Sequence, residues 1–246
     1  MMEIKECKNG CRTAAALLIA LGLLAGGFFP GYYYYKAKMD ANFVSVKGLA
    51  EMDVKADLAV WDIKFVATHD NLQTAQQNML SNLQKIKNFL KKQGLSESEI
   101  FEGRLETNDL MTNPYRDRNF ASRYILSQTV TVRSANVDTV EKALSETGEL
   151  VAEGVVFDSQ SYGSPVSYIF TKLNEIKPQM LEEATKNAEL AAAEFAKSSN
   201  SRVGKIRRAS QGVFSILPRV QTMNSAEINQ INKKVRVVST IEYWLE

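Results

Sequence analysis

The stretch TAAALLIALGLLAGGFF, residues 13–29, contains seventeen residues without a charge and decides how the rest of the chain is organised. Pro30 and Gly31 follow it, and then four tyrosines, Tyr32–Tyr35. A helix over the apolar run rises about 25 Å, and its continuation through the tyrosines gives about 34 Å. A bilayer's hydrocarbon core is about 30 Å thick, and tyrosine favours the membrane–water interface. The stretch therefore predicts a membrane-spanning helix over residues 13–35.

The charges before the apolar run predict its orientation. The basic residues there are Lys5, Lys8 and Arg12. Because basic residues stay on the cytoplasmic side, residues 1–12 are expected in the cytoplasm and the chain after the helix outside it. Residues 36–42 read as a short polar linker, and residues 43–246 as an extracytoplasmic domain. The result is a single-pass anchor with its N-terminus inside.

A cleaved secretory signal is the alternative interpretation, because it has the same charged start and apolar centre. Ala25-Gly26-Gly27 would serve as a small-residue cleavage site, but Phe28, Phe29 and Pro30 follow it. The aromatic belt suits a retained anchor better, since it matches the interface where such a helix leaves the membrane. The anchor is the favoured interpretation, and the sequence leaves cleavage open.

Composition excludes several classes of protein. Thirty basic and 28 acidic residues give a net charge of +2, which indicates no polyanionic partner such as nucleic acid. Apolar residues make up 45% of the chain, so the domain is expected to fold. Both cysteines, Cys7 and Cys11, precede the anchor and are expected as free thiols in a reducing compartment. No further ligands accompany them, so no metal site is assigned.

The apolar periodicity after the linker predicts strands and helices. The predicted strands cover residues 43–48, 54–68 with an irregularity near Trp61-Asp62, 101–111, 121–133, 155–159, 166–171, 205–216 with a bulge at Gly212, and 233–245. The predicted helices cover residues 72–90 after a cap at His69-Asp70-Asn71, 137–151 weakened by Gly148, and 177–196 with an extra turn from Leu173. Gly94 is expected to end the first helix, and residues 218–232 to be irregular.

Two helices have a clear apolar face. In the first, the apolar residues are spaced by three or four: Leu72, Ala75, Met79, Leu83, Ile86 and Leu90. In the third, the predicted face consists of Met180, Ala184, Ala188, Ala191 and Phe195, with Leu181, Ala192 and Ala196 beside it. The small residues predict that this helix lies close to a sheet.

The order of elements predicts an α+β fold, with a mainly antiparallel sheet and helices packed on it. Strand–helix–hairpin occurs twice, over residues 54–133 and again over residues 166–245. This order suggests duplicated β-α-β-β units, although the residues themselves do not repeat convincingly.

Few residues suggest chemistry. His69 is the single histidine and sits where a strand meets a helix, so a capping role accounts for it. The densest basic patch consists of Lys205, Arg207 and Arg208 with Arg202 nearby, which suits anionic headgroups, an acidic partner or an ordinary strand face. The loop with Tyr115, Arg116, Arg118 and Phe120 is a second candidate surface, because tyrosine and arginine are common at interfaces. No catalytic, cofactor-binding or metal-binding residue is assigned.

Four blocks of the chain resemble the SIMPL-domain family. They are Phe43-Val44-Ser45-Val46-Lys47-Gly48-Leu49-Ala50-Glu51 continuing through Val54–Trp61, Ala184-Thr185-Lys186-Asn187-Ala188 continuing to Ala196, Ala209-Ser210-Gln211-Gly212, and Lys234-Val235-Arg236-Val237-Val238. The resemblance covers nearly all of residues 43–245 and is similar to the bacterial members that keep an N-terminal anchor. It implies a cell-envelope protein of the bacterial inner membrane with a periplasmic domain and no established enzymatic activity.

Three functions follow from this interpretation. The first is a non-enzymatic, membrane-anchored envelope protein that self-associates or binds a partner; the resemblance to ring-forming and oxidative-stress-linked members implies a homo-oligomer and a role in envelope stress tolerance. The second is a periplasmic ligand-binding or chaperone-like module with an apolar groove. The third, remote one is a hydrolase centred on His69.

Overall fold

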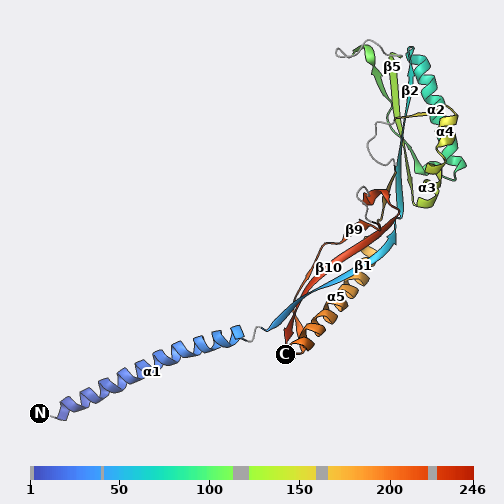
Figure 1. Ribbon diagram of the computed structural model, residues 1–246. Helices are drawn as coiled ribbons and strands as arrows, with labels where there is room; N and C mark the ends of the chain where they lie inside the picture. The colour runs from blue at the N-terminus through green and yellow to red at the C-terminus, as the bar shows by residue number, and fades with distance from the viewer. Residues whose placement is uncertain (1–2, 40–41, 113–121, 159–165, 221–225) are drawn as a thin grey trace. The chain divides into compact units, whose positions relative to one another are not determined.

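The computed structural model describes residues 3–39, 42–112, 122–158, 166–220 and 226–246, with side chains from Leu17 onward except for residues 25 and 37–39 (Figure 1). The helices are α1 (Glu3–Met39), α2 (Leu72–Lys92), α3 (Val137–Ser145), α4 (Gly148–Ala152) and α5 (Leu173–Ser198). The strands are β1 (Phe43–Lys55), β2 (Leu58–His69), β3 (Ile100–Glu102), β4 (Glu106–Asp109), β5 (Tyr124–Ser134), β6 (Val156–Phe157), β7 (Val166–Ile169), β8 (Val203–Gln211), β9 (Ser215–Pro218) and β10 (Asn232–Leu245).

The strands form two sheets. In the four-stranded sheet, β10 lies between β1 and β8, and β9 also pairs with β10. In the six-stranded sheet the order is β3-β5-β2-β6, with β4 on β5 and β7 on β2. The pairings within the second sheet, and those of β8 and β9 with β10, are antiparallel. The predicted α+β class is therefore confirmed.

The chain forms two compact units. Unit one comprises Met1–Gly48, Ala184–Gly212 and Ser239–Glu246, and unit two comprises Leu49–Glu183 and Val213–Val238. Each unit has a cluster of buried apolar side chains of its own. Three long elements, β1, α5 and β10, contribute residues to both units.

The core of unit two is built by α2 and the six-stranded sheet. Alternate residues of β2 are buried: Ala59, Trp61, Ile63, Phe65 and Ala67. Helix α2 buries Ala75, Met79, Ile86 and Leu90 and partly buries Leu83, which confirms the predicted face from Ala75 onward. Leu72 was expected on this face but is 43% exposed, because it is the first residue of the helix. Figure 1 shows α2, α3 and α4 on one side of β2 and β5. The side chain of Asn71 accepts the backbone N–H groups of Gln73 and Thr74, so Asn71 is the predicted cap.

The core of unit one depends on alanines of α5. Ala184, Ala188, Ala192 and Ala196 are buried at intervals of four residues, which places them along one side of the helix. A Cβ atom at Gly48 of β1 would lie 1.8 Å from the backbone oxygen of Ala184 and 2.8 Å from the Cβ of Ala188. The predicted close approach of this helix to a sheet is thus confirmed. Phe195 was expected on this face but is 61% exposed, because only small side chains fit the contact.

The predicted strand over residues 54–68 is wrong at its start. β1 continues to Lys55, and the break lies at Ala56-Asp57. Burial alone would raise the pKa of Asp57, but its carboxylate accepts the backbone N–H and the hydroxyl of Thr171, both at 2.7 Å, and these bonds hold the pKa below its usual value. From Ala59 to His69 the pairing with β5 is uninterrupted, so the irregularity expected at Trp61-Asp62 is absent from this strand.

Three other predicted elements are each divided in two. The strand expected over residues 101–111 becomes β3 and β4, the helix over residues 137–151 becomes α3 and α4, and the strand over residues 205–216 becomes β8 and β9. The first interruption includes Gly103, whose N–H donates to the Thr129 backbone oxygen while a Cβ there would lie 2.7 Å from that oxygen. Helix α5 is continuous from Leu173, with Pro178 inside it.

The duplicated order exists, but its second copy starts elsewhere than predicted. In the six-stranded sheet the chain order is β2, α2, the interrupted strand β3 and β4, and then β5. In space, β5 lies between β2 and the interrupted strand. The four-stranded sheet repeats this order with β10 between β1 and the interrupted β8 and β9, α5 being its helix. Its first strand is β1, since β7 pairs with β2 of the other sheet. The second copy is therefore discontinuous along the chain.

Helix α1 contains the predicted anchor. Residues Leu17–Lys36 are long and apolar enough to cross a membrane, by length and composition. The described side chains of this segment are exposed to solvent, and Pro30 lies within the helix. These properties agree with the predicted span over residues 13–35, but the linker expected over residues 36–42 is helical as far as Met39, because α1 continues beyond the tyrosines.

We predict that Gly48→Ala destabilises residues 42–246 by about 3 kcal/mol, because the added methyl group overlaps the backbone of α5. The matched control is Gly148→Ala, since a Cβ at Gly148 would meet nothing within 4 Å. Alanine is favoured over glycine in a helix, so this change should leave stability unchanged or raise it by up to about 1 kcal/mol. Urea unfolding followed by circular dichroism measures both. Equal stability of the two variants would show that α5 does not contact β1 as described.

Candidate functional site

The basic patch predicted at Lys205, Arg207 and Arg208 lies on β8, where the pairing with β10 is irregular. Arg208 pairs with Glu242 and Ile206 pairs with Tyr243, so Arg207 is an additional residue on β8. Such a bulge redirects the side chain of the extra residue. The patch is therefore not a uniform strand face.

Arg207 is held by three side chains, Phe43 of β1 and Glu242 and Trp244 of β10. Its guanidinium carbon lies 4.1 Å from the ring centroid of Phe43 and 5.1 Å from that of Trp244. Its Nη1 atom donates to Oε2 of Glu242 at 3.3 Å. Sequence reasoning found Arg207 but missed these three partners, because they come from strands far apart in the chain. The arrangement fixes Arg207 on the sheet and leaves Arg208 and Lys205 exposed.

β8 is an edge of the four-stranded sheet. Its inner side pairs with β10, and no strand among the described residues pairs with its outer side. Every residue from Lys205 to Gln211 is exposed, so both faces of the strand are open. An unpaired edge presents free N–H and C=O groups, which pair readily with a strand of another chain. β8 therefore has the properties of a surface for strand addition.

Exposed apolar side chains occur in the same unit. Ile206 of β8 is 51% exposed, and Leu190 and Phe195 of α5 are 58% and 61% exposed. Ile206 interrupts the run of basic residues on the edge, and an apolar side chain at that position gains from being covered. A partner strand on β8 would bury Ile206. The basic residues on either side of Ile206 would then favour a partner strand with acidic residues.

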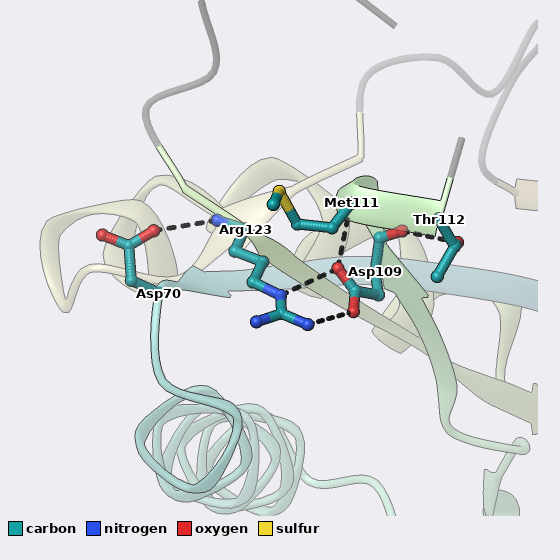
Figure 2. Close-up of polar contacts among 5 residues, drawn as sticks. All are labelled: Asp70, Asp109, Met111, Thr112 and Arg123. Atoms are coloured by element: carbon teal, nitrogen blue, oxygen red, sulfur yellow. Dashed lines mark hydrogen bonds and ion pairs between the residues drawn. The ribbon is translucent and has the colours of Figure 1, made fainter. Parts of the chain in front are cut away.

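A second arrangement lies at the β4–β5 hairpin of unit two. Figure 2 shows Arg123 facing Asp109, with Nε 3.0 Å from Oδ1 and Nη2 2.8 Å from Oδ2. Asp109 also accepts the Met111 N–H at 2.9 Å, and its backbone oxygen accepts the Thr112 hydroxyl at 2.8 Å. Asp70 accepts the Arg123 backbone N–H at 2.9 Å. The hydrogen bonds to Asp109 raise the pKa of Arg123, which stays charged and ties the two strands together.

This arrangement joins the residues on either side of the predicted interface loop. The loop's candidate residues, Tyr115, Arg116, Arg118 and Phe120, lie outside the described residues. Its surface function therefore remains a prediction. The structure describes the residues before and after it, Thr112 and Arg123, and both take part in the contacts of Asp109.

His69 occupies the position expected of a capping residue. Its Nδ1 atom accepts the backbone N–H of Asn71 at 2.9 Å, and Asn71 in turn caps α2. His69 therefore takes part in the turn between β2 and α2, where a structural role accounts for it. The hydrolase centred on this residue gains no support from its hydrogen bonds.

A groove of about 640 Å³ in unit two is lined mainly by charged and amide side chains. Its cations are paired, since Lys55 lies 2.5 Å from Asp138 and Arg219 lies 3.3 Å from Asp53. Tyr168 lies in the wall with 5% of its surface exposed, and burial, with the charge of Glu141, raises the pKa of its phenol. The ligand-binding alternative required an apolar groove, and this lining suits a small polar ligand instead.

In the part of the chain that the structure describes, no group of three or more His, Cys, Asp or Glu side chains could hold a metal ion. Cys7 and Cys11 belong to α1, in the portion whose side chains are not described.

Comparison with protein families identifies the family of the chain. A family model matches residues 44–242 and is described as SIMPL, a protein of unknown function (DUF541). The chain belongs to the SIMPL family. A search of curated proteins gave no match to it. SIMPL is not a known enzyme family, so no catalytic residue is transferred to this chain.

The blocks that carried the SIMPL resemblance build mainly the four-stranded sheet and its helix. They lie in β1 and the start of β2, in α5, at the end of β8, and in β10. The close approach at Gly48 joins the first of these blocks to the second. The resemblance thus corresponds to residues that pack together and not to a set of chemical groups.

We predict that Arg207→Lys lowers the free energy of unfolding of residues 42–246 by about 1 kcal/mol, because lysine cannot stack its charge on two rings. Arg208→Lys is the matched control and should leave stability unchanged, because this side chain is exposed on the same strand. Thermal unfolding measures the difference. An equal effect of the two changes would mean that the Phe43 and Trp244 contacts add nothing.

Proposed function

We propose that this SIMPL protein is a non-enzymatic, membrane-anchored protein of the bacterial cell envelope that acts by binding protein through the β8 edge. In this proposal residues 1–12 lie in the cytoplasm, the helix over residues 13–35 crosses the inner membrane once, and residues 43–246 lie in the periplasm. The supporting observation is the strand from Lys205 to Gln211, exposed on both faces and unpaired on one side among the described residues. Envelope stress tolerance is the process that the family resemblance implies.

Self-association is the form of binding that the sheet favours. Two β8 strands facing each other would place several like charges together, which is unfavourable across a strand pair. β1, the opposite edge of the sheet among the described residues, carries Glu51 and Asp53, which also pair with cations of their own copy: Glu51 with Lys234 and Arg236, and Asp53 with Arg219. A head-to-tail contact of β8 with the β1 edge of a second copy avoids the repulsion and brings opposite charges closer. Head-to-tail contacts of this kind close into rings when the rotation between copies permits.

Ligand binding is the second candidate, and the polar groove at Tyr168 is the observation that favours it. The paired cations on its walls favour small polar ligands over lipids or unfolded chains. This function does not exclude binding through β8, because the groove lies within unit two.

The test is the mass of residues 42–246 in solution, followed by sedimentation velocity over a range of concentrations. We expect a defined oligomer that Ile206→Lys weakens by about tenfold or more, because a charge replaces the apolar side chain within the edge. Leu190→Lys is the matched control, since Leu190 has a similar exposure but lies on α5, and it should assemble normally.

Two results would contradict this proposal in different ways. A monomer at every concentration would remove self-association and leave capture of another protein or a polar ligand. Assembly of Ile206→Lys equal to that of the unchanged chain would remove β8 as the contact surface.

A further inference from the structure

The first residues of β1 lie at an end of the four-stranded sheet where three segments are joined by backbone hydrogen bonds. The N–H of Leu245 donates to the backbone oxygen of Asn42 at 2.9 Å. Arg202 and Glu246 exchange two such bonds, of 2.7 and 2.9 Å. The start of β1, the start of β8 and the end of β10 therefore share this end of the sheet.

The chain itself limits how far this end can be from the apolar helix. α1 ends at Met39 and β1 begins at Phe43, four residues later. Consecutive Cα atoms are 3.8 Å apart, so the two residues can be separated by no more than about 15 Å. If α1 spans the membrane, this end of the sheet must lie within that distance of the helix end.

The side chains at this end combine aromatic rings with basic groups. Phe43 is 41% exposed and Trp244 is half-buried, with the Arg207 guanidinium over both rings. Three further cations, Arg202, Lys205 and Arg208, are exposed on or beside β8. Three carboxylates lie near them: Glu242, which pairs with Arg207, Glu246, whose Oε1 atom would lie 2.9 Å from a Cβ at Gly204, and Glu189, whose charge acts on Tyr243, so the four cations still outnumber them. The local charge is therefore positive.

We propose that this end of the sheet docks on the anionic phospholipid headgroups around its own anchor. Tryptophan favours the interfacial layer, and basic side chains near a membrane surface are attracted to anionic lipids within about one Debye length, roughly 10 Å. The exposed cations contact headgroup phosphates, while Phe43 and Trp244 reach the interface. This inference rests on the membrane anchoring in the proposed function and adds a second contact with the same membrane.

The test uses the full chain in lipid vesicles and the fluorescence of Trp244. The chain has two tryptophans, and Trp61 is buried in the core of unit two. In Trp61→Phe the emission comes from Trp244 alone, and in Trp244→Phe it comes from Trp61 and serves as the control. We expect phosphatidylglycerol vesicles with lipids brominated near the headgroup to quench Trp244 about twofold and to leave Trp61 unchanged.

A charge variant separates headgroup docking from simple proximity to the membrane. Arg202→Gln, Lys205→Gln and Arg208→Gln together should abolish the quenching, as should vesicles of neutral phosphatidylcholine, while the protein stays in the membrane after carbonate extraction. Retained protein without quenching in phosphatidylglycerol would overturn the docking and leave the anchor intact. Quenching that is independent of charge would overturn the headgroup contact, and loss of the protein on extraction would overturn the anchor as well.

Discussion

The contact on which unit one depends is the close approach of α5 to β1 at Gly48. A helix packs at backbone distance only where side chains on both elements are small, and here alanines four residues apart meet a glycine. The same alanines leave little volume between helix and sheet, so the core of this unit is thin and is completed by residues of β10 such as Ile241 and Tyr243. The outer strand β8 receives little cover and remains exposed along most of its length.

The discontinuous second copy explains why β1 and β10 are so long. β1 begins in unit one and ends in unit two, where Asp57 binds Thr171 just before α5 begins. β10 runs in the opposite sense along the chain, from unit two into unit one. The residues between β1 and α5 form the other sheet with its own helices. β1 and β10 are neighbours in the four-stranded sheet, yet more than a hundred residues separate them in the sequence.

Local patterns predicted most of the fold. The spacing of apolar residues located α2 and its buried face, and alternation located β10. The sequence did not predict that Lys233 of β10 is fully buried. Its burial depends on an ion pair with Glu227 of a neighbouring turn, and the alternation of the strand does not indicate that pair. The break before Asp57 and the partners of Arg207 were missed for the same reason, since each depends on side chains from distant segments. The candidate patch on β8 was predictable as a cluster of charges, but its position on a sheet edge was not.

The β8 edge connects family, fold and function. A SIMPL chain offers no established chemistry, and in this one the described residues place the exposed, basic strand in the same unit as the segment leading to the apolar helix. Hydrogen exchange of the full chain, compared below and above the concentration at which it associates, tests this connection most directly. Binding at the edge predicts that the amides of β8 become protected on association, while β5, paired on both sides, exchanges slowly throughout. Association without protection of β8 would contradict it.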